Sequence, residues 1–390
     1  MFELAGKIYK AAADYFCSAI YFMITGTYDY GVMGADGAVD GAIFIGDLMR
    51  IGGHMTTSSQ FGSVITTLIK NGTVALQGFG IAVALLFSFI GIIELAAGNR
   101  LTPELLIKHF AKFGATFAAI IISDDLCFLI GNLGNGMING VEKLFSGNAL
   151  ATLAIKTMGE GGVKGVGDAV KLHLYNTLVY SIKGKAGIGD AISLFVSGSI
   201  LMIPVLALQI GNVAVFFIAL SRGLELAVRA LFMPIPIAFL SDDGWKGAGG
   251  RYLKKYAAVA TQGMVVVAIA KCVQIFTSSI GTEFALALKG FITNLPCYTD
   301  KADKAMKDLG INSADWANIA SVEAAVVPFG FIESIFASVS SVNNEVSLSQ
   351  VLLALRPGTL KLSFLCVAVA FAGVGLMAKS LQICNDIWGV

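Results

Sequence analysis

Apolar stretches about as long as a bilayer-spanning helix recur along most of the chain after residue 70. A helix rises about 1.5 Å per residue, so about 20 apolar residues cross the roughly 30 Å hydrocarbon core of a membrane. Apolar residues form 56% of the 390-residue chain and charged residues only 14%, which is far more apolar than a soluble domain. The sequence therefore predicts an all-α, polytopic integral membrane protein.

Six of these stretches are predicted to span the membrane, and a shorter one is broken by proline. The predicted spans are residues 74–97, about 105 or 112 to 130, 191–220, 256–276, 319–339 and 362–377. Residues 222–240 are too short after Arg229 to span, and Pro234 and Pro236 interrupt them. That segment is predicted to be a re-entrant or interfacial hairpin.

The regions between the spans complete the predicted organisation. At the start of the chain, Glu3, Lys7, Lys10 and Asp14 follow one stripe of an amphipathic helix, which could lie on a membrane or against a neighbouring subunit. The predicted regions are an extracytoplasmic helix and glycine-rich connector (1–73), two spans (74–135), an extracytoplasmic loop region (136–190), a central membrane core containing the hairpin (191–280), a second extracytoplasmic loop (281–318), and C-terminal spans with a short tail (319–390).

The distribution of lysine and arginine predicts the orientation of the chain. These residues are nearly twofold denser in segments 98–112, 221–255 and 340–361 than in the other segments outside the spans. Cytoplasmic loops hold an excess of basic residues, so both termini are predicted to be extracytoplasmic. The net charge of +1 and the lack of a long basic run give no sign of a dedicated nucleic-acid-binding domain.

Ionisable residues inside apolar stretches are candidates for function because they are costly at membrane depth. Lys271 is the strongest, and Glu94 or Asp125 could be its partner in a proton or ion pathway. The alternative is that Lys271 reaches the interface through its flexible stem or forms a structural pair between subunits.

No motif of an enzyme occurs in the chain. The sequence contains neither G-x-S-x-G nor H-E-x-x-H, and the glycine cluster at 159–168 lacks the Gly-Lys-Ser/Thr ending of a phosphate loop. The six cysteines and three histidines are scattered, without the spacing of metal ligands. The chain is thus expected to have no catalytic residues, cofactor or metal.

A resemblance to a known family lies between about residues 215 and 270. The residues that carry it are Leu220–Arg229, Met233–Pro236, Asp242–Tyr256 and Ala260–Gly263. This order of a charged helix, a proline-containing hairpin, a glycine-containing loop and a basic start to the next span resembles the TrbL-like polytopic inner-membrane subunits of type IV secretion (conjugation) machines.

The resemblance implies a multi-pass protein of the bacterial inner membrane that forms a homo-oligomeric channel or assembly platform. Its implied partners are other inner-membrane secretion components, cytoplasmic ATPases, pilin-like extracytoplasmic proteins and the DNA or protein in transit. Arg222, Glu225 and Arg229 share one helical face and could contact another subunit or solvent. Arg251, Lys254 and Lys255 could face anionic lipid or an ATPase.

Two other functions remain open from the residues alone. The first is a small-solute or ion transporter that uses Lys271 and a carboxylate. The second is a structural scaffold that does not line a pore. A transporter should depend on Lys271, whereas a secretion subunit should depend more on its oligomer interfaces.

Overall fold

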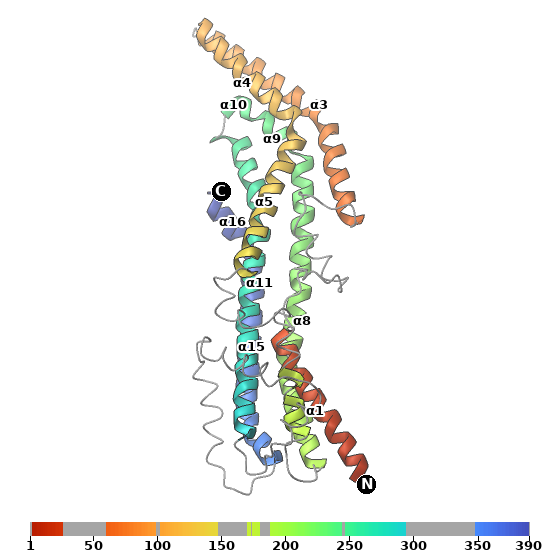
Figure 1. The fold of residues 1–390 in the computed structure, drawn as a ribbon. Helices are drawn as coiled ribbons and strands as arrows, with labels where there is room; N and C mark the ends of the chain where they lie inside the picture. The colour runs from red at the N-terminus through yellow and green to blue at the C-terminus, as the bar shows by residue number, and fades with distance from the viewer. Residues whose placement is uncertain are drawn as a thin grey trace. The chain divides into compact units, whose positions relative to one another are not determined.

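The computed structural model describes residues 2–25, 60–98, 102–146, 170–172, 174–179, 188–243, 246–293 and 348–389. The regular elements in these ranges are helices, which confirms the all-α prediction (Figure 1). The chain forms two compact units. Unit 1 comprises Met1–Tyr28, Lys143–Val213 and Ala270–Gly375, and unit 2 comprises Asp29–Glu142, Ala214–Ile269 and Leu376–Val390.

The helices follow one another along the chain with bounds that mostly extend the predicted spans. They are α1 (Phe2–Thr25), α3 (Gln60–Ala97), α4 (Pro103–Ile121), α5 (Ser123–Ser146), α8 (Ile188–Leu231), α9 (Pro234–Ala238), α10 (Leu240–Asp243), α11 (Ala248–Thr293), α15 (Leu348–Ala378) and α16 (Ser380–Trp388). The boundaries between the two units fall inside α5, α8, α11 and α15.

Four helical stretches of the described chain are long and apolar enough to cross a membrane. They are Ile69–Ala97, Ile188–Leu231, Ala248–Val273 and Thr359–Ala378. Helices α4 and α5 make a fifth if they are counted as one span, bent by 69°. The protein is therefore a membrane-embedded helical protein. The predicted span 319–339 lies outside the described residues and stays a prediction.

Several boundaries differ from those read in the sequence. Helix α3 begins 14 residues before Val74, and α11 continues to Thr293, into the region predicted to be a loop. Helix α5 runs through its glycines to Ser146, and one of them, Gly134, lies where α11 packs closely. Residues 222–231, which were assigned to the hairpin, continue α8. The break in the chain therefore comes at the prolines and not at the charged residues.

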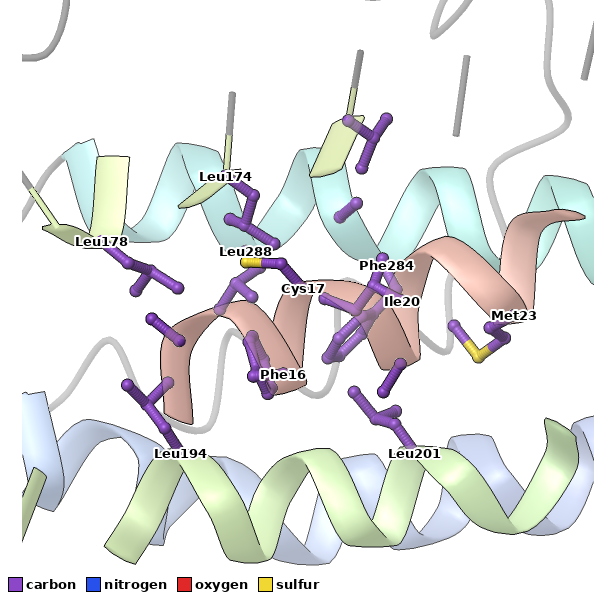
Figure 2. Close-up of a cluster of buried hydrophobic side chains, with 14 of the residues drawn as sticks. Phe16, Cys17, Ile20, Met23, Leu174, Leu178, Leu194, Leu201, Phe284 and Leu288 are labelled. Atoms are coloured by element: carbon purple, nitrogen blue, oxygen red, sulfur yellow. The ribbon is translucent and has the colours of Figure 1, made fainter. Parts of the chain in front are cut away.

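The core of unit 1 is built around α1. Phe16, Cys17, Ile20 and Met23 are fully buried and point toward residues of the helical stretch 174–179 and of α8 and α11 (Figure 2). Lys7, Lys10 and Asp14 of the polar stripe are exposed, and the Asp14 carboxylate lies 3.3 Å from the Lys171 ammonium. The amphipathic prediction thus holds, but the apolar face packs within the chain itself.

In unit 2, α3 and α4 run antiparallel and pack side by side (Figure 1). Gln77 donates a hydrogen bond to the carbonyl of Ile121 (2.9 Å), and the ring of His109 donates to the carbonyl of Ser88 (3.0 Å). Helix α4 begins at a proline preceded by Thr102, whose hydroxyl accepts a hydrogen bond from a backbone N–H of the first turn.

Candidate functional site

The end of α8 is stabilised by side chains from two other helices of unit 2. Pro234 has no N–H, so the carbonyl of Ala230, one turn earlier, loses its usual donor. This carbonyl accepts a hydrogen bond from the backbone N–H of Met233 instead (3.0 Å). The Thr73 hydroxyl in α3 lies 3.3 Å from the same carbonyl, although its shorter hydrogen bond is to the carbonyl of Ile69 in its own helix (2.6 Å). The neighbouring carbonyl of Arg229 accepts a hydrogen bond from the Tyr252 hydroxyl in α11 (2.7 Å). The carbonyl groups of Arg229 and Ala230 at the end of α8 therefore both have partners within the protein.

The proline turn that follows, formed by α9 and α10, is covered by the chain itself. A methyl group on Gly80 of α3 would lie 2.8 Å from the carbonyl oxygen of Pro234, so that only glycine fits there. The ring of Phe87 lies against that of Phe239, with centroids 5.0 Å apart. On the other side, Gly249 at the start of α11 packs on the carbonyl of Pro236. The turn is thus enclosed by α3 and α11.

Arg222, two and a half turns before the end of α8, is the most buried charged residue of this region. Its side chain is only 2% exposed. The Nε group donates to the carbonyl of Val259 (3.0 Å) and the Nη2 group donates to that of Ala260 (2.8 Å), both within α11. A guanidinium suits this task because its fixed donors can bind two adjacent carbonyls at once. The arginine therefore fastens α8 to the middle of an apolar helix.

Helix α5 approaches the same part of α11 from another direction. A methyl group on Gly134 would lie 2.9 Å from the carbonyl carbon of Ala260 and closer still to its oxygen. The Tyr256 hydroxyl donates to the carbonyl of Cys127 (3.3 Å). A methyl group on Gly263 would meet the Arg222 guanidinium at 3.1 Å. Glycines thus let α5 approach the backbone of α11 and leave room on α11 for the Arg222 side chain of α8, and small residues serve such close helix packing in other membrane proteins.

The short C-terminal helix α16 adds two hydrogen bonds to the same stretch of α11. The Gln262 amide donates to the hydroxyl of Ser380 (2.8 Å), and the indole N–H of Trp388 donates to that of Thr261 (3.1 Å). We call the set Arg222, Tyr256, Val259, Ala260, Thr261, Gln262 and Gly263 the Arg222 junction. Helices α5, α8, α11 and α16 meet there, and it is the candidate functional site.

The predicted row of Arg222, Glu225 and Arg229 is divided by the structure. Glu225 accepts hydrogen bonds from Arg229 at 2.9 Å to Nε and 2.6 Å to Nη2, and both side chains are partly exposed. Arg222 instead points into α11. The Glu225 pair is the kind of contact, four residues apart on a helix, that contributes only about 0.3–0.5 kcal/mol.

The predicted basic cluster lies at the start of α11. Arg251, Lys254 and Lys255 are all exposed, whereas Tyr252 and Tyr256 turn inward to the hydrogen bonds described above. Cations in the first turns of a helix face the positive end of its dipole, which is unfavourable. Anionic groups near this end of α11 would remove that cost.

The intramembrane residues predicted to work together are distributed over both units. Lys271 is half-buried in the part of α11 that belongs to unit 1. Glu94 is exposed in the last turn of α3, and Asp125 is exposed in the first turn of α5, beside the 69° bend; both belong to unit 2. A pair of Lys271 with either carboxylate therefore stays a prediction. Among the described residues, no group of three or more His, Cys, Asp or Glu could hold a metal ion.

Sequence reasoning did not identify the residues that complete the junction. Thr261 and Gln262 are adjacent polar residues inside the apolar stretch 256–276, and that was the available signal. Gly134 was interpreted as part of a glycine-rich stretch that ends the second predicted span, and Gly263 as part of the segment that resembles TrbL-like subunits. Their spacing in the sequence gives no indication that they lie at a helix crossing.

The comparisons with known proteins identify no relative. No family model, no curated protein and no solved structure matches the chain.

Proposed function

We propose that this protein is a membrane channel or assembly-platform subunit of a type IV secretion apparatus in a bacterial inner membrane. The observation that supports the proposal is the way residues 215–270, which carry the resemblance to TrbL-like subunits, are joined. The end of α8, the proline turn and the start of α11 are connected by the bonds of Arg222 to Val259 and Ala260 and of Tyr252 to Arg229. Residues 215–269 of this segment all belong to unit 2, and these bonds connect its parts.

The character of these contacts suits a platform. A buried cation held by two backbone carbonyls, and glycines at backbone distance, fix the helices in one arrangement. A platform needs such fixed helices because other components assemble on it. In this proposal the subunit forms homo-oligomers, other inner-membrane components and pilin-like proteins assemble on it, ATPases dock on its cytoplasmic side, and DNA or protein passes through it or beside it.

The exposed surface of the helices agrees with burial in lipid or against further subunits. Phe79, Phe89 and Ile93 of α3 are each more than half exposed. In a span these side chains need lipid or the apolar face of a neighbouring chain. In the proposed orientation, which rests on the distribution of basic residues, the basic start of α11 lies in the cytoplasm and both termini lie outside.

A transporter for a small solute or an ion is the second candidate. The observation in its favour is Lys271, an ammonium in a long apolar helix. In this alternative the ammonium and a carboxylate would bind the solute or carry a proton, and neutralising the lysine would abolish transport.

The experiment that separates the two candidates is a deletion in the host, complemented with variants. The readouts are the frequency of conjugative transfer or secretion, and the uptake of labelled solutes. The secretion proposal expects transfer to be lost on deletion and restored by wild type, Lys271→Arg and Lys271→Met alike. Normal transfer in the deletion strain would contradict it. Solute uptake that is restored by wild type but not by Lys271→Met would establish the transporter.

A further inference from the structure

Helix α16 depends on unit 2 for its own structure. It has nine residues and follows α15 after a single residue, Lys379, which provides no side-chain cap. It ends at Gly389, whose φ of 63° lies in the left-handed region that favours glycine. Isolated helices of this length are not stable in water, so α16 is helical because it packs on α11.

One face of α16 carries nearly all of this packing. Ser380 and Cys384, one turn apart, are completely buried, and Trp388 continues the same face one turn later. Asp386 on the opposite face is exposed, and so is Ile387, which lies beside the buried face. Two side-chain hydrogen bonds, Gln262 to Ser380 and Trp388 to Thr261, join the buried face to α11.

The buried face of α16 lies beside the Arg222 guanidinium. Thr261 and Gln262, which bind α16, directly follow Ala260, which accepts the hydrogen bond from Arg222. Burial raises the pKa of the Cys384 thiol, and the neighbouring Thr261 hydroxyl and Arg222 guanidinium oppose this shift. Helix α16 thus contributes to the burial of the charged group.

The other helices that meet at the junction are much longer than α16. Arg222 belongs to a helix of 44 residues and Gly134 to one of 24, and both are fixed by contacts with the backbone of α11. Short elements that depend on packing for their structure open at a lower free energy than the global unfolding of a protein. The junction therefore combines a firm part made by α5, α8 and α11 with a weakly held cover.

We propose that α16 is a latch that opens and closes over the Arg222 junction while the contacts among α5, α8 and α11 persist. In the closed state it excludes water from Arg222, Thr261 and Gln262. In the open state these three side chains are hydrated, and the buried cation becomes accessible to anions. The latch is a property of unit 2 and holds for a secretion subunit and for a transporter alike.

Two single-cysteine reporters test the proposal in the full-length chain in lipid nanodiscs. One retains only Cys384, under the latch, and the other retains only Cys127, which is buried in α5. The rate of reaction with a maleimide is measured for each and divided by the rate of the same thiol in the denatured chain. The proposal expects Cys384 to react faster than Cys127 on this scale.

Weakening the latch should then affect only the first reporter. Gln262→Leu and Trp388→Phe each remove one hydrogen-bond donor, which should raise the rate for Cys384 about fivefold, the factor that corresponds to about 1 kcal/mol. Ile387→Ala, which changes a side chain that is exposed, is the matched control and should leave the rate unchanged. The Cys127 rate should stay low in every variant, which also shows that each variant is folded.

Two results would overturn the latch. Equal rates for Cys384 and Cys127 that rise together in the variants would mean that α16 opens only when unit 2 unfolds. A Cys384 rate that neither Gln262→Leu nor Trp388→Phe changes, with Cys127 still protected, would mean that these contacts do not control access to the junction.

Discussion

The close crossing of α5 and α11 can be tested with two glycines of α5 that differ only in what surrounds them. A methyl group on Gly134 would lie 2.9 Å from the carbonyl carbon of Ala260, whereas ordinary contact begins at 3.4 Å, so the helices must separate by at least 0.5 Å. A methyl group on Gly136 would meet nothing within 4 Å. The two alanine variants therefore share the change in helix propensity and differ in the clash.

The expected free energies follow from these two terms. Alanine is better than glycine in a helix by about 1 kcal/mol, and this gain applies to both variants. Overpacking of a close contact costs about 1–3 kcal/mol, and it applies only to Gly134→Ala. Gly136→Ala should thus be more stable than wild type by up to about 1 kcal/mol, and Gly134→Ala should be less stable than Gly136→Ala by about 1–3 kcal/mol.

The assay is reversible unfolding of the purified protein in mixed micelles, followed by circular dichroism as the fraction of denaturing detergent rises. The difference in unfolding free energy between the two variants measures the clash directly, because the propensity term cancels. Equal stability of Gly134→Ala and Gly136→Ala would refute the crossing, since it would mean that α5 does not touch the backbone of α11 at Ala260.

Three further predictions concern other contacts. Tyr252→Phe removes the donor to the carbonyl of Arg229 and should lower the unfolding free energy by about 1 kcal/mol in the same titration; no change would contradict that cap. Burial raises the pKa of the Cys17 thiol, so the folded protein keeps it neutral while the unfolded chain ionises it above about pH 8.5. Stability should therefore fall as the pH rises above that value, and Cys17→Ala should show a smaller fall in thermal unfolding measured from pH 7 to 10; an identical fall would show that Cys17 does not contribute. Replacing Lys254 and Lys255 by Gln should reduce the stabilisation by phosphatidylglycerol by about 1 kcal/mol for each residue, seen as a smaller difference in unfolding free energy between anionic and zwitterionic nanodiscs, and an unchanged difference would exclude lipid contact there.

The membrane class and most spans could be predicted because they depend on local composition. Apolar stretches such as 74–97 and 362–377 predict membrane-spanning helices from their own length and composition, without knowledge of the neighbouring helices. The amphipathic character of α1 was equally visible in the spacing of Lys7, Lys10 and Asp14. Its place in the core of unit 1 was not, because an apolar helix face does not reveal what covers it.

The Arg222 junction could not be predicted because it consists of contacts between residues far apart in sequence. Arg222 shares a helical face with Glu225 and Arg229, which favours a surface row, yet the partners of Arg222 are backbone carbonyls of α11. Backbone acceptors leave no trace in the sequence. Glycines raise the same difficulty, since Gly134 and Gly136 look alike until the position of α11 is known.

The most direct test of the proposed function is the mass of the complex purified in lipid nanodiscs or a mild detergent, with identification of the proteins that accompany it. The secretion proposal predicts a closed ring of several copies, together with an ATPase or a pilin-like protein. A monomer or dimer without partners would contradict it and would make the transporter, with Lys271 at its centre, the better account.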